Sequence, residues 1–388
     1  MNDFAEDEYN FRYKRTKREM EKLELDALLI TTENNYIYYT GHTSTYWTHH
    51  WMWGSSTTYP FLFVLPKDGD PVVIVHSAEE EAAKASTWID DVQSWTGYPF
   101  SISCLEKIIS KLDLEKGKIG CELGADTRVG IPYEEFEKLK RTFPDAEFVD
   151  ASKAIWQNRM IKSTEEVCRI KKANEITISA LERFYAAAKF GVTEREAATQ
   201  IQRFMIDEGA DHCQYFLTYQ VRSGATPMFQ SRPLDRAYEK GECVYLDFGA
   251  SYKGYCADAN RMFVAGSATQ EMEDTYEVLR YTEEQMIRSV GPGVKISNVY
   301  QVSNKSLEQR GVKGTDYGRA GHGTGIAVAE PPSIGPDDPT VLQEGMTITI
   351  EPRIVNSYGY FTVEDTVLVT STGHEVLTPG PRELHVIE

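Results

Sequence analysis

Five side chains that commonly bind metal ions lie in the C-terminal half of this 388-residue chain, each in strand-like or glycine-rich sequence. They are two aspartates, one histidine and two glutamates: Asp247, Asp258, His322, Glu351 and Glu364. A buried carboxylate is costly unless it encloses a cation, shares a proton or faces basic groups. Four carboxylates with one imidazole form a hard donor set, which favours Mn, Co or Fe over a thiolate zinc site. We interpret these residues as a set of metal ligands.

The two aspartates are expected on a β-hairpin. Residues 242–248 alternate apolar and polar side chains, residues 249–254 read as a turn, and residues 255–263 resume strand character. This arrangement predicts that Asp247 and Asp258 approach one another from opposite strands. The alternative for this stretch alone is a hairpin with two solvent-facing aspartates. The downstream histidine and glutamates favour the metal site.

The chain divides into two expected domains, 1–156 and 157–388. The first alternates strands and helices, which predicts an α/β domain with a mixed sheet. The second opens with a long helix over 164–189, for which Ser163 is the expected N-cap. The fold class is therefore α+β, with residues 154–162 as the connection. Further helices are expected over 11–23, 34–41 (or a turn), 79–85, 133–143, 193–208, 271–290 and 296–310, and strands over 26–31, 60–65, 71–76 and 118–122.

The composition narrows the possible partners and compartment. A formal charge of -18 and a pI near 5.0 argue against nucleic acid or an anionic membrane surface as a partner. The six cysteines are scattered, and no two of them form a Cys-x-x-Cys pair. Residues 1–24 are too charged for a signal peptide, and no apolar stretch is long enough to cross a membrane. We expect a cytoplasmic protein with reduced thiols.

Seven motifs distributed along nearly the whole chain carry a resemblance to a known family. They are Asn35-Tyr-Ile-Tyr-Tyr-Thr-Gly41, Asn158-Arg-Met-Ile-Lys-Ser163, Asp247-Phe-Gly249, Asp258-Ala-Asn-Arg261, Gly321-His-Gly-Thr-Gly325, Glu351-Pro352 and Val363-Glu-Asp365. The pattern resembles the pita-bread metallopeptidases, which include prolidase, Xaa-Pro aminopeptidase, methionine aminopeptidase and the non-peptidase creatinase. The resemblance implies a creatinase-like α/β N-terminal domain followed by a pita-bread catalytic domain.

The resemblance also implies a dinuclear site. Two divalent ions (Mn, Co, Fe or Zn) would be held by the five ligands, with Asp258 and Glu364 bridging, Asp247 on one ion, and His322 and Glu351 on the other. Two ions roughly 3.5–4 Å apart can activate a bridging water and polarise a scissile carbonyl. Glu351 is also expected to take part in catalysis. The alternative is a site that keeps these ligands but works without metal, as in creatinase.

Four positions depart from the family's pattern. Gln230 and Ala329 stand where the peptidases have histidines that bind substrate and stabilise the tetrahedral intermediate. Thr362 stands where arginine is usual in the prolidase branch, and Asn260 where threonine is usual. Losing one donor to the intermediate typically costs on the order of 10²–10³ in rate. Gln230 keeps a donor for catalysis, whereas Ala329 has none. The departures therefore indicate either drift in a weak peptidase or a retained metal site with a changed substrate.

Three hypotheses for function follow. The first is a dinuclear metal-dependent hydrolase that resembles Xaa-Pro dipeptidase or aminopeptidase and cleaves a C–N amide bond of a dipeptide or small molecule. The second is a creatinase-like amidinohydrolase or a dimethylsulfoniopropionate lyase on the same fold, in which Glu330 and Arg353 are candidates for new catalytic and substrate contacts. The third is a catalytically inactive binding module, against which the complete ligand set argues.

An aromatic loop over residues 42–54 is the remaining candidate for substrate binding. Trp47, Trp51 and Trp53 are expected to border the active site of the same or a partner subunit, and cation–π contacts there would suit a small cationic substrate. The resemblance implies a homodimer in which such a loop reaches the partner. The alternative is a subunit interface or domain core. A separate metal site is a further alternative, with ligands His42, His49 and His50.

Overall fold

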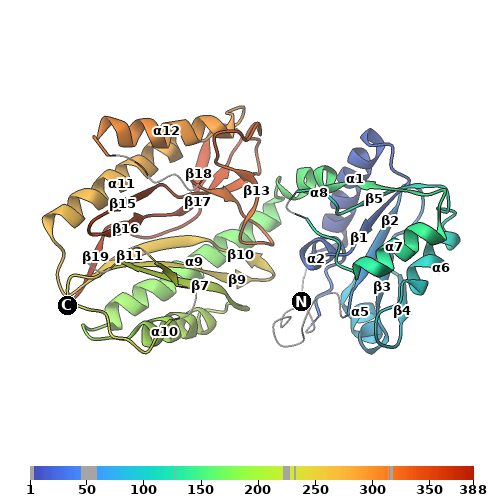
Figure 1. Ribbon diagram of the computed structural model, residues 1–388, viewed down its shortest axis with the longest axis horizontal. Helices are drawn as coiled ribbons and strands as arrows, with labels where there is room; N and C mark the ends of the chain where they lie inside the picture. Colours follow the sequence, from blue (N-terminus) through green and yellow to red (C-terminus); the bar gives the residue numbers. More distant parts are fainter. Residues whose placement is uncertain are drawn as a thin grey trace. The chain divides into compact units, whose positions relative to one another are not determined.

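The computed structural model separates the chain into two compact units, Met1–Arg159 and Met160–Glu388 (Figure 1). It describes residues 4–44, 59–125, 127–221, 228–230, 233–312, 314 and 318–388, and only the backbone for 214–221 and 228–230. The predicted connection over 154–162 is wrong in its first part, because helix α8 occupies Ser152–Arg159. The Asn158 amide of α8 donates to the Arg12 carbonyl at 3.1 Å, so this helix belongs to the first unit.

The first unit contains a mixed sheet with the strand order β4-β3-β2-β1-β5-β6. The strands are β1 (Ala27–Ile30), β2 (Leu62–Pro66), β3 (Val72–His76), β4 (Asp91–Trp95), β5 (Lys118–Cys121) and β6 (Glu147–Asp150). β1 pairs antiparallel with β2 and parallel with β5, which confirms the predicted mixed sheet. The strands that were not predicted, β4 and β6, are its two edges. Both carry exposed polar residues, so they lack the apolar pattern of the central strands.

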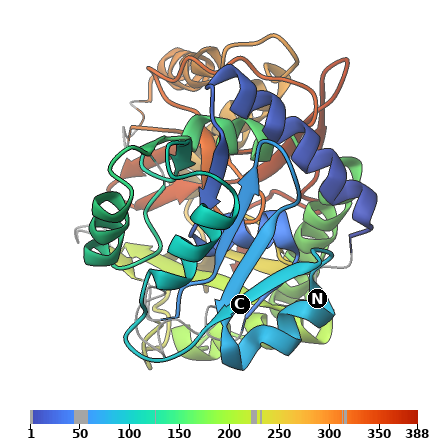
Figure 2. The ribbon, with the colours of Figure 1, turned by 90° about the vertical axis from the view of Figure 1, so that its right-hand side faces the viewer.

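Helices cover both faces of this sheet (Figure 2). They are α1 (Glu6–Lys22), α2 (Glu33–Thr40), the 3-10 turn Ser77–Glu79, α5 (Glu80–Ser86), α6 (Ser103–Lys111), α7 (Tyr133–Thr142) and α8. α6 and α7 pack through Leu105 and Phe136 on one face. On the other face, Tyr13 of α1 and Tyr39 of α2 lie with ring centroids 5.8 and 5.3 Å from Phe63.

The second unit contains two sheets and a hairpin between paired helices. The first sheet has the order β19-β11-β9-β7-β8, with β10 paired to β9. Its strands are β7 (His212–Val221), β8 (Met228–Gln230), β9 (Cys243–Tyr252), β10 (Tyr255–Cys256), β11 (Ala259–Ala265) and β19 (His385–Ile387). The second sheet has the order β13-β12-β14-β17-β18, formed by β12 (His322–Gly323), β13 (Glu330–Ser333), β14 (Thr347–Ile350), β17 (Asp365–Val369) and β18 (His374–Val376). The hairpin consists of β15 (Arg353–Asn356) and β16 (Gly359–Thr362).

Two helix pairs enclose these strands. They are α9 (Thr164–Ala187) with α10 (Glu194–Asp207), and α11 (Gln270–Arg288) with α12 (Ile296–Gln309); Figure 1 shows them on opposite sides of the strands. Capping boxes start α9 at Ser163 and α10 at Thr193, as the sequence predicts. Each such cap stabilises its helix by about 1 kcal/mol. The caps therefore define where the helices that support the first sheet begin.

The two faces of β9 serve different purposes because successive side chains of a strand point to opposite sides. Leu246 and Phe248 pack with α9 and α10, whereas Tyr245 faces the other helix pair. The predicted turn over 249–254 is wrong in its first part. β9 continues to Tyr252, and the turn is the pair Lys253-Gly254, both with positive φ. Burial of Ser251 and pairing of this segment with β7 extend the strand.

The first and second sheets meet at one antiparallel bridge between Asn260 of β11 and Glu364. Glu364 lies between β16 and β17. The strand divides there because β16 pairs with β15 whereas β17 pairs with β14. This junction places residues from both sheets in one small region.

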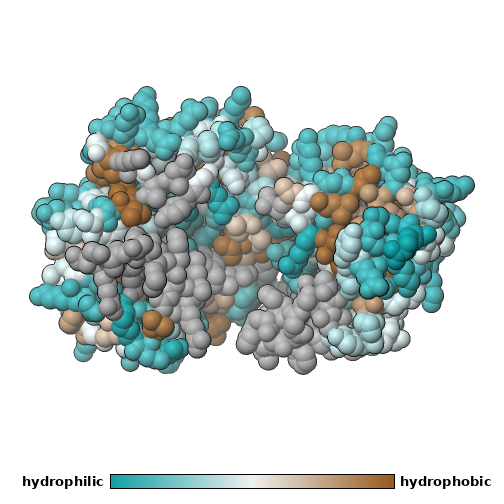
Figure 3. Space-filling model, in the orientation of Figure 1, coloured by the Kyte–Doolittle hydropathy of each residue, from teal (hydrophilic) through white to brown (hydrophobic). Residues whose placement is uncertain are grey.

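Hydrophilic side chains predominate among the described residues on the face drawn in Figure 3, in keeping with the strongly acidic composition. Within the described part of the chain, no helix combines the length and the apolar character that a membrane span requires.

Candidate metal centre

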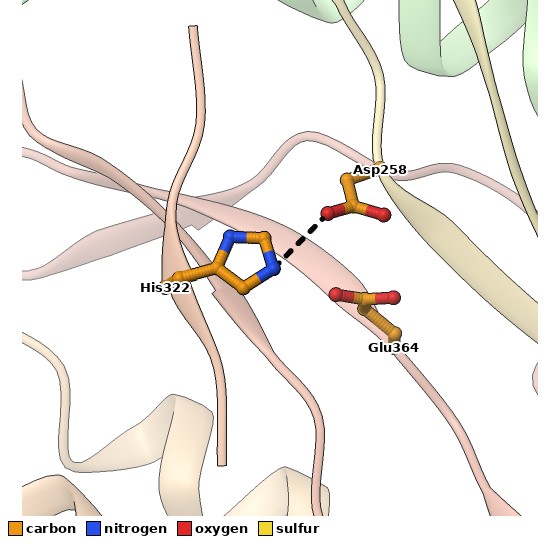
Figure 4. Close-up of side chains that lie close together, drawn as sticks. All are labelled: Asp258, His322 and Glu364. Carbon is orange, nitrogen blue, oxygen red and sulfur yellow. Dashed lines mark ion pairs between the residues drawn. The ribbon is translucent and has the colours of Figure 1, made fainter. Parts of the chain in front are cut away.

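Asp258, His322 and Glu364 converge at the junction of the two sheets (Figure 4). One ligand atom from each lies within 4.8 Å of the others, and all three residues are buried. Asp258 follows β10, His322 begins β12, and Glu364 precedes β17. Three predicted ligands that are far apart in the sequence therefore form one cluster.

The imidazole of His322 is oriented for ligation. Its Nδ1 lies 3.0 Å from the Gly323 carbonyl oxygen, which assigns the proton to Nδ1 and the lone pair to Nε2. Nε2 lies 3.3 Å from Asp258 Oδ2. Burial, with a contribution from Arg319, lowers the pKa of His322 to about 4, so the ring is neutral at pH 7. A lone pair thus faces a carboxylate oxygen, an arrangement that a cation between them stabilises.

The glycines beside His322 are required by close backbone contacts. A Cβ added at Gly321, whose φ is 138°, would lie 2.1 Å from the Thr349 carbonyl oxygen. A Cβ at Gly323 would lie 2.3 Å from the Pro331 carbonyl oxygen. The glycine-flanked histidine motif therefore lets β12 fit between β13 and β14 with its imidazole held in place.

Glu364 has one hydrogen-bonded oxygen and one that is left for a ligand. Oε2 accepts from Asn260 Nδ2 at 3.1 Å, whereas the buried Oε1 accepts no hydrogen bond from the described residues. Burial raises the pKa of Glu364 well above its usual value, and the nearby charges of Asp258, Glu351 and Asp247 raise it further. A buried acceptor within reach of three other carboxylates fits a divalent cation.

Asp247 approaches the cluster from β9. It is the cross-strand partner of Asn260. The Tyr245 hydroxyl, two residues earlier on the same face, donates a hydrogen bond to Asp247 Oδ2. We did not predict this contact, although the period-two spacing of the strand points to it. The compact group of three does not include Asp247 or Glu351.

Glu351 follows β14 and is buried beside two arginines. Arg353 Nη2 donates to Glu351 Oε2, and its Nη1 donates to the Arg319 carbonyl at 2.9 Å. Burial raises the pKa of Glu351, while Arg353 and Arg319 oppose that rise. Arg353, predicted to bind substrate, therefore contacts a predicted metal ligand.

Glu330, predicted to be catalytic, has internal partners. Its Oε2 lies 3.5 Å from Lys162 Nζ, with both side chains buried, and its Oε1 accepts from the Ala327 amide at 3.0 Å. The adjacent Ala329 is exposed. The pair joins the start of the second unit to the segment that follows the metal-ligating histidine, a role for Lys162 that we did not predict.

Arg261 stabilises the junction itself. Its Nη1 donates to the carbonyls of Asn260 and Glu364, each at 2.8 Å, and its Nη2 donates to Asp365 Oδ1 at 2.8 Å. The Thr362 hydroxyl donates to the Pro352 carbonyl at 3.0 Å and so connects the hairpin to the segment after Glu351. These contacts hold the backbone on which two of the candidate ligands are placed.

The side chains of several predicted site residues lie outside the part of the chain that the structure describes. Those outside the described residues are Trp47, His49, His50, Trp51 and Trp53. Gln230 ends strand β8, where its backbone is opposite Thr218 of β7, and its side chain is likewise outside the description. The roles proposed for them remain predictions.

Comparison with known families agrees with this geometry. Residues 168–371 match the family described as metallopeptidase family M24, and residues 12–161 match the creatinase/prolidase N-terminal domain. The chain belongs to metallopeptidase family M24. The predicted fold, a creatinase-like N-terminal domain followed by a pita-bread catalytic domain, is confirmed.

Individual relatives cover almost the whole chain. It is 30% identical over 324 residues to a Xaa-Pro dipeptidase from Lactobacillus delbrueckii subsp. lactis, covering 83% of this chain and 86% of the relative. The crystal structure of a recombinant prolidase from Thermococcus sibiricus matches with a TM-score of 0.84 and 28% identity, covering 97% and 99% of the two chains. A prolidase from Pyrococcus horikoshii OT3 matches with a TM-score of 0.79 and 28% identity, covering 97% and 100%.

These matches settle the class of protein. The chain is a metal-dependent hydrolase of the peptidase type, and the enzyme prediction is confirmed. The comparisons do not favour the creatinase-like or lyase alternative, and an inactive binding module does not fit a peptidase with its ligand cluster in place.

Proposed function

We propose that this enzyme hydrolyses the amide bond before proline in Xaa-Pro dipeptides. The observation that carries the proposal is the buried convergence of Asp258, His322 and Glu364 in a chain of the M24 family. The names of the relatives, Xaa-Pro dipeptidase and prolidase, supply the substrate class.

Two divalent ions are the proposed cofactor, held by Asp247, Asp258, His322, Glu351 and Glu364. The donor set is hard and rich in oxygen, which suits Mn, Co or Fe and also accommodates Zn. The neutral Nε2 of His322 and the free Oε1 of Glu364 fit this role. Bound ions of this kind lower the pKa of water and polarise a carbonyl oxygen.

The protein's own groups would handle the proton and orient the ligands. Water adds to the scissile carbonyl carbon, the C–N bond breaks, and one proton must reach the leaving nitrogen. Glu351 is proposed to transfer that proton, since burial raises the pKa of its carboxyl group. Asn260 and Tyr245 hold Glu364 and Asp247 in position, and Gln230 is proposed to donate to the developing oxyanion.

The test is metal content measured beside turnover. Metal-free protein is reloaded separately with Mn, Co, Fe and Zn, then assayed with Gly-Pro, Gly-Gly, creatine and dimethylsulfoniopropionate. Asp258→Ala should lose bound metal and Gly-Pro cleavage together, whereas Asp274→Ala, on an exposed surface of α11, should keep both. Full metal content with full turnover in Asp258→Ala would refute the site. Turnover of creatine or dimethylsulfoniopropionate without Gly-Pro cleavage would refute the substrate class.

We further propose a homodimer that works in the cytoplasm. None of the six cysteines forms a disulfide bond, in keeping with a reducing compartment. In the dimer, Trp47, Trp51 and Trp53 would border an active site. Alanine variants of all three that bind and turn over substrate normally would reduce the loop to a structural role. Light scattering of the purified protein checks the dimer.

A further inference from the structure

A small pocket lies between helix α9 and the segment that leads into β19. Its lining includes side chains from both of these and from β11, among them Leu181, Glu182, Tyr185, Arg261, Leu384 and His385. Its solvent-accessible volume is about 90 Å³, and about 10–15 Å³ is enough for one water molecule. None of the five proposed metal ligands lines it. The pocket therefore has room for a small organic molecule at a place outside the metal centre.

Gly380 lets the C-terminal segment lie close to α9. Its φ is 85°, a conformation that glycine adopts without strain. A Cβ added at Gly380 would lie 2.7 Å from Ile178 Cγ2 and 3.0 Å from Glu182 Oε1. The carbonyl of the next residue, Pro381, accepts a hydrogen bond from Arg261 Nε at 3.0 Å. These contacts fix the two walls of the pocket and place the Glu182 carboxylate beside the C-terminal segment.

Tyr185 and His385 form an aromatic wall of the pocket. Their rings are stacked, with centroids 4.0 Å apart and an angle of 13° between the planes. The Tyr185 hydroxyl donates to the Met262 carbonyl at 3.3 Å, whereas the ring nitrogens of His385 make no hydrogen bond with the described residues. Burial lowers the pKa of His385, so the ring is neutral at pH 7 and keeps one nitrogen as an acceptor. Leu181 and Leu384 add aliphatic surface.

The charges at the pocket leave one carboxylate without a counter-ion. The guanidinium of Arg261 is matched by Asp365 at 2.8 Å, and the carboxylate of Glu383 is matched by Arg280 at 3.0 Å. The carboxylate of Glu182 forms neither an ion pair nor a hydrogen bond with the rest of the described chain. Apolar walls with a free carboxylate and a neutral imidazole suit a ligand that combines an aliphatic chain with a cationic head.

We propose that this pocket binds a small primary aliphatic amine in its ammonium form. The chain of the amine lies against Leu181 and Leu384, and the ammonium group donates to the carboxylate of Glu182 and to the imidazole of His385. The site is distinct from the metal centre and goes beyond the proposed hydrolysis. Its inner wall is Arg261, whose Nη1 donates to the Glu364 carbonyl at 2.8 Å.

The experiment uses n-butylammonium as the probe and compares it with methylammonium, n-butanol and n-butyrate. Binding to the metal-loaded, full-length protein is measured by ligand-observed NMR titration. Butylammonium should saturate one site and bind at least about tenfold more tightly than methylammonium, because its longer chain buries more apolar surface. Butanol should bind more weakly than butylammonium, and butyrate should not bind, since its carboxylate meets that of Glu182.

Three variants test the named contacts. Glu182→Gln should weaken the binding of butylammonium by about threefold to fivefold and leave that of butanol unchanged. Leu384→Trp fills the pocket and should abolish the binding of both. Glu175→Gln, at an exposed position of α9 outside the pocket, is the matched control and should bind as the unmodified protein does. Urea unfolding is measured for each variant, and the two glutamate variants decide the outcome if Leu384→Trp does not fold.

Removal of metal with a chelator distinguishes the pocket from the metal centre, to which an amine nitrogen can also bind. Unchanged affinity for butylammonium after chelation supports the pocket. Loss of binding on chelation, no saturation up to about 100 mM butylammonium, or equal affinities of Glu182→Gln and Glu175→Gln overturns the proposal. These measurements do not depend on Gly-Pro cleavage, so a failure of the proposed function leaves them decisive.

Discussion

Replacing Asn260 by leucine should weaken metal binding without dissolving the fold. Asn260 is fully buried, and its Nδ2 lies 3.1 Å from Glu364 Oε2 and 3.4 Å from the Thr362 hydroxyl. Leucine has the same number and branching of side-chain heavy atoms but no donor. The variant therefore removes the hydrogen bond that orients a proposed ligand and leaves the backbone bridge to Glu364 in place.

The size of the effect follows from the charge of the acceptor. A hydrogen bond to a charged group contributes about 1.5–3 kcal/mol, and about 1.4 kcal/mol corresponds to a tenfold change in an equilibrium constant. Loss of a group that orients a metal ligand commonly costs about 10–100-fold in metal affinity. Both estimates predict that the dissociation constant rises by about 10–100-fold for the metal that supports the highest turnover. Without the donor the pKa of Glu364 rises further, so the loss should grow as pH falls.

The assay is a competition titration of metal-free protein against a chromophoric chelator at several pH values. Asn260→Thr keeps a hydroxyl donor and should retain much of the affinity. Asn298→Leu, on an exposed position of α12, is the matched control and should bind as the unmodified protein does. The reasoning is refuted if Asn260→Leu unfolds like the unmodified protein and binds metal within about threefold of it.

Three further predictions concern other parts of the chain. Burial lowers the pKa of His42 from about 6.5 in the unfolded chain to about 4 in the folded protein. The unfolded chain therefore binds more protons between these two pH values, and the free energy of unfolding should rise with pH across that range by at most about 1.4 kcal/mol per pH unit. In urea unfolding, the stability of His42→Gln should depend less steeply on pH. Lys162→Met breaks the buried pair with Glu330 and should lower the free energy of unfolding by about 3–5 kcal/mol. Lys171→Met removes an exposed pair and should change the free energy of unfolding by less than about 1 kcal/mol. Equal effects of the two variants in denaturant unfolding would contradict the stabilising role of the buried pair. Gly-Pro cleavage should be slow in the unmodified enzyme and faster in the double variant Gln230→His with Ala329→His. A kcat/KM of the unmodified enzyme within about 10⁴–10⁸ M⁻¹s⁻¹ would show that residues 230 and 329 have little influence on the rate of cleavage.

Local sequence determined the elements that support the site. Ser163 and Thr193, each followed three residues later by glutamate, predicted the starts of α9 and α10 because a capping box satisfies the backbone amides of the first helical turn. Apolar stretches likewise predicted β1, β2, β3 and β5 of the first unit. The sequence also identified the candidate metal ligands, since carboxylates in apolar strands require a cation, a proton or a basic group beside them.

Tertiary structure alone decided how those elements meet. The bridge between Asn260 and Glu364 joins two sheets across 104 residues of sequence, and no local pattern specifies it. The same is true of the buried pair between Lys162 and Glu330, 168 residues apart. The register that sets Arg353 opposite Thr362 depends on where the β15–β16 turn falls. Such contacts arise from packing between segments that are distant in the sequence. The sequence therefore predicts which chemistry each residue can perform, whereas the tertiary structure determines which residue it contacts.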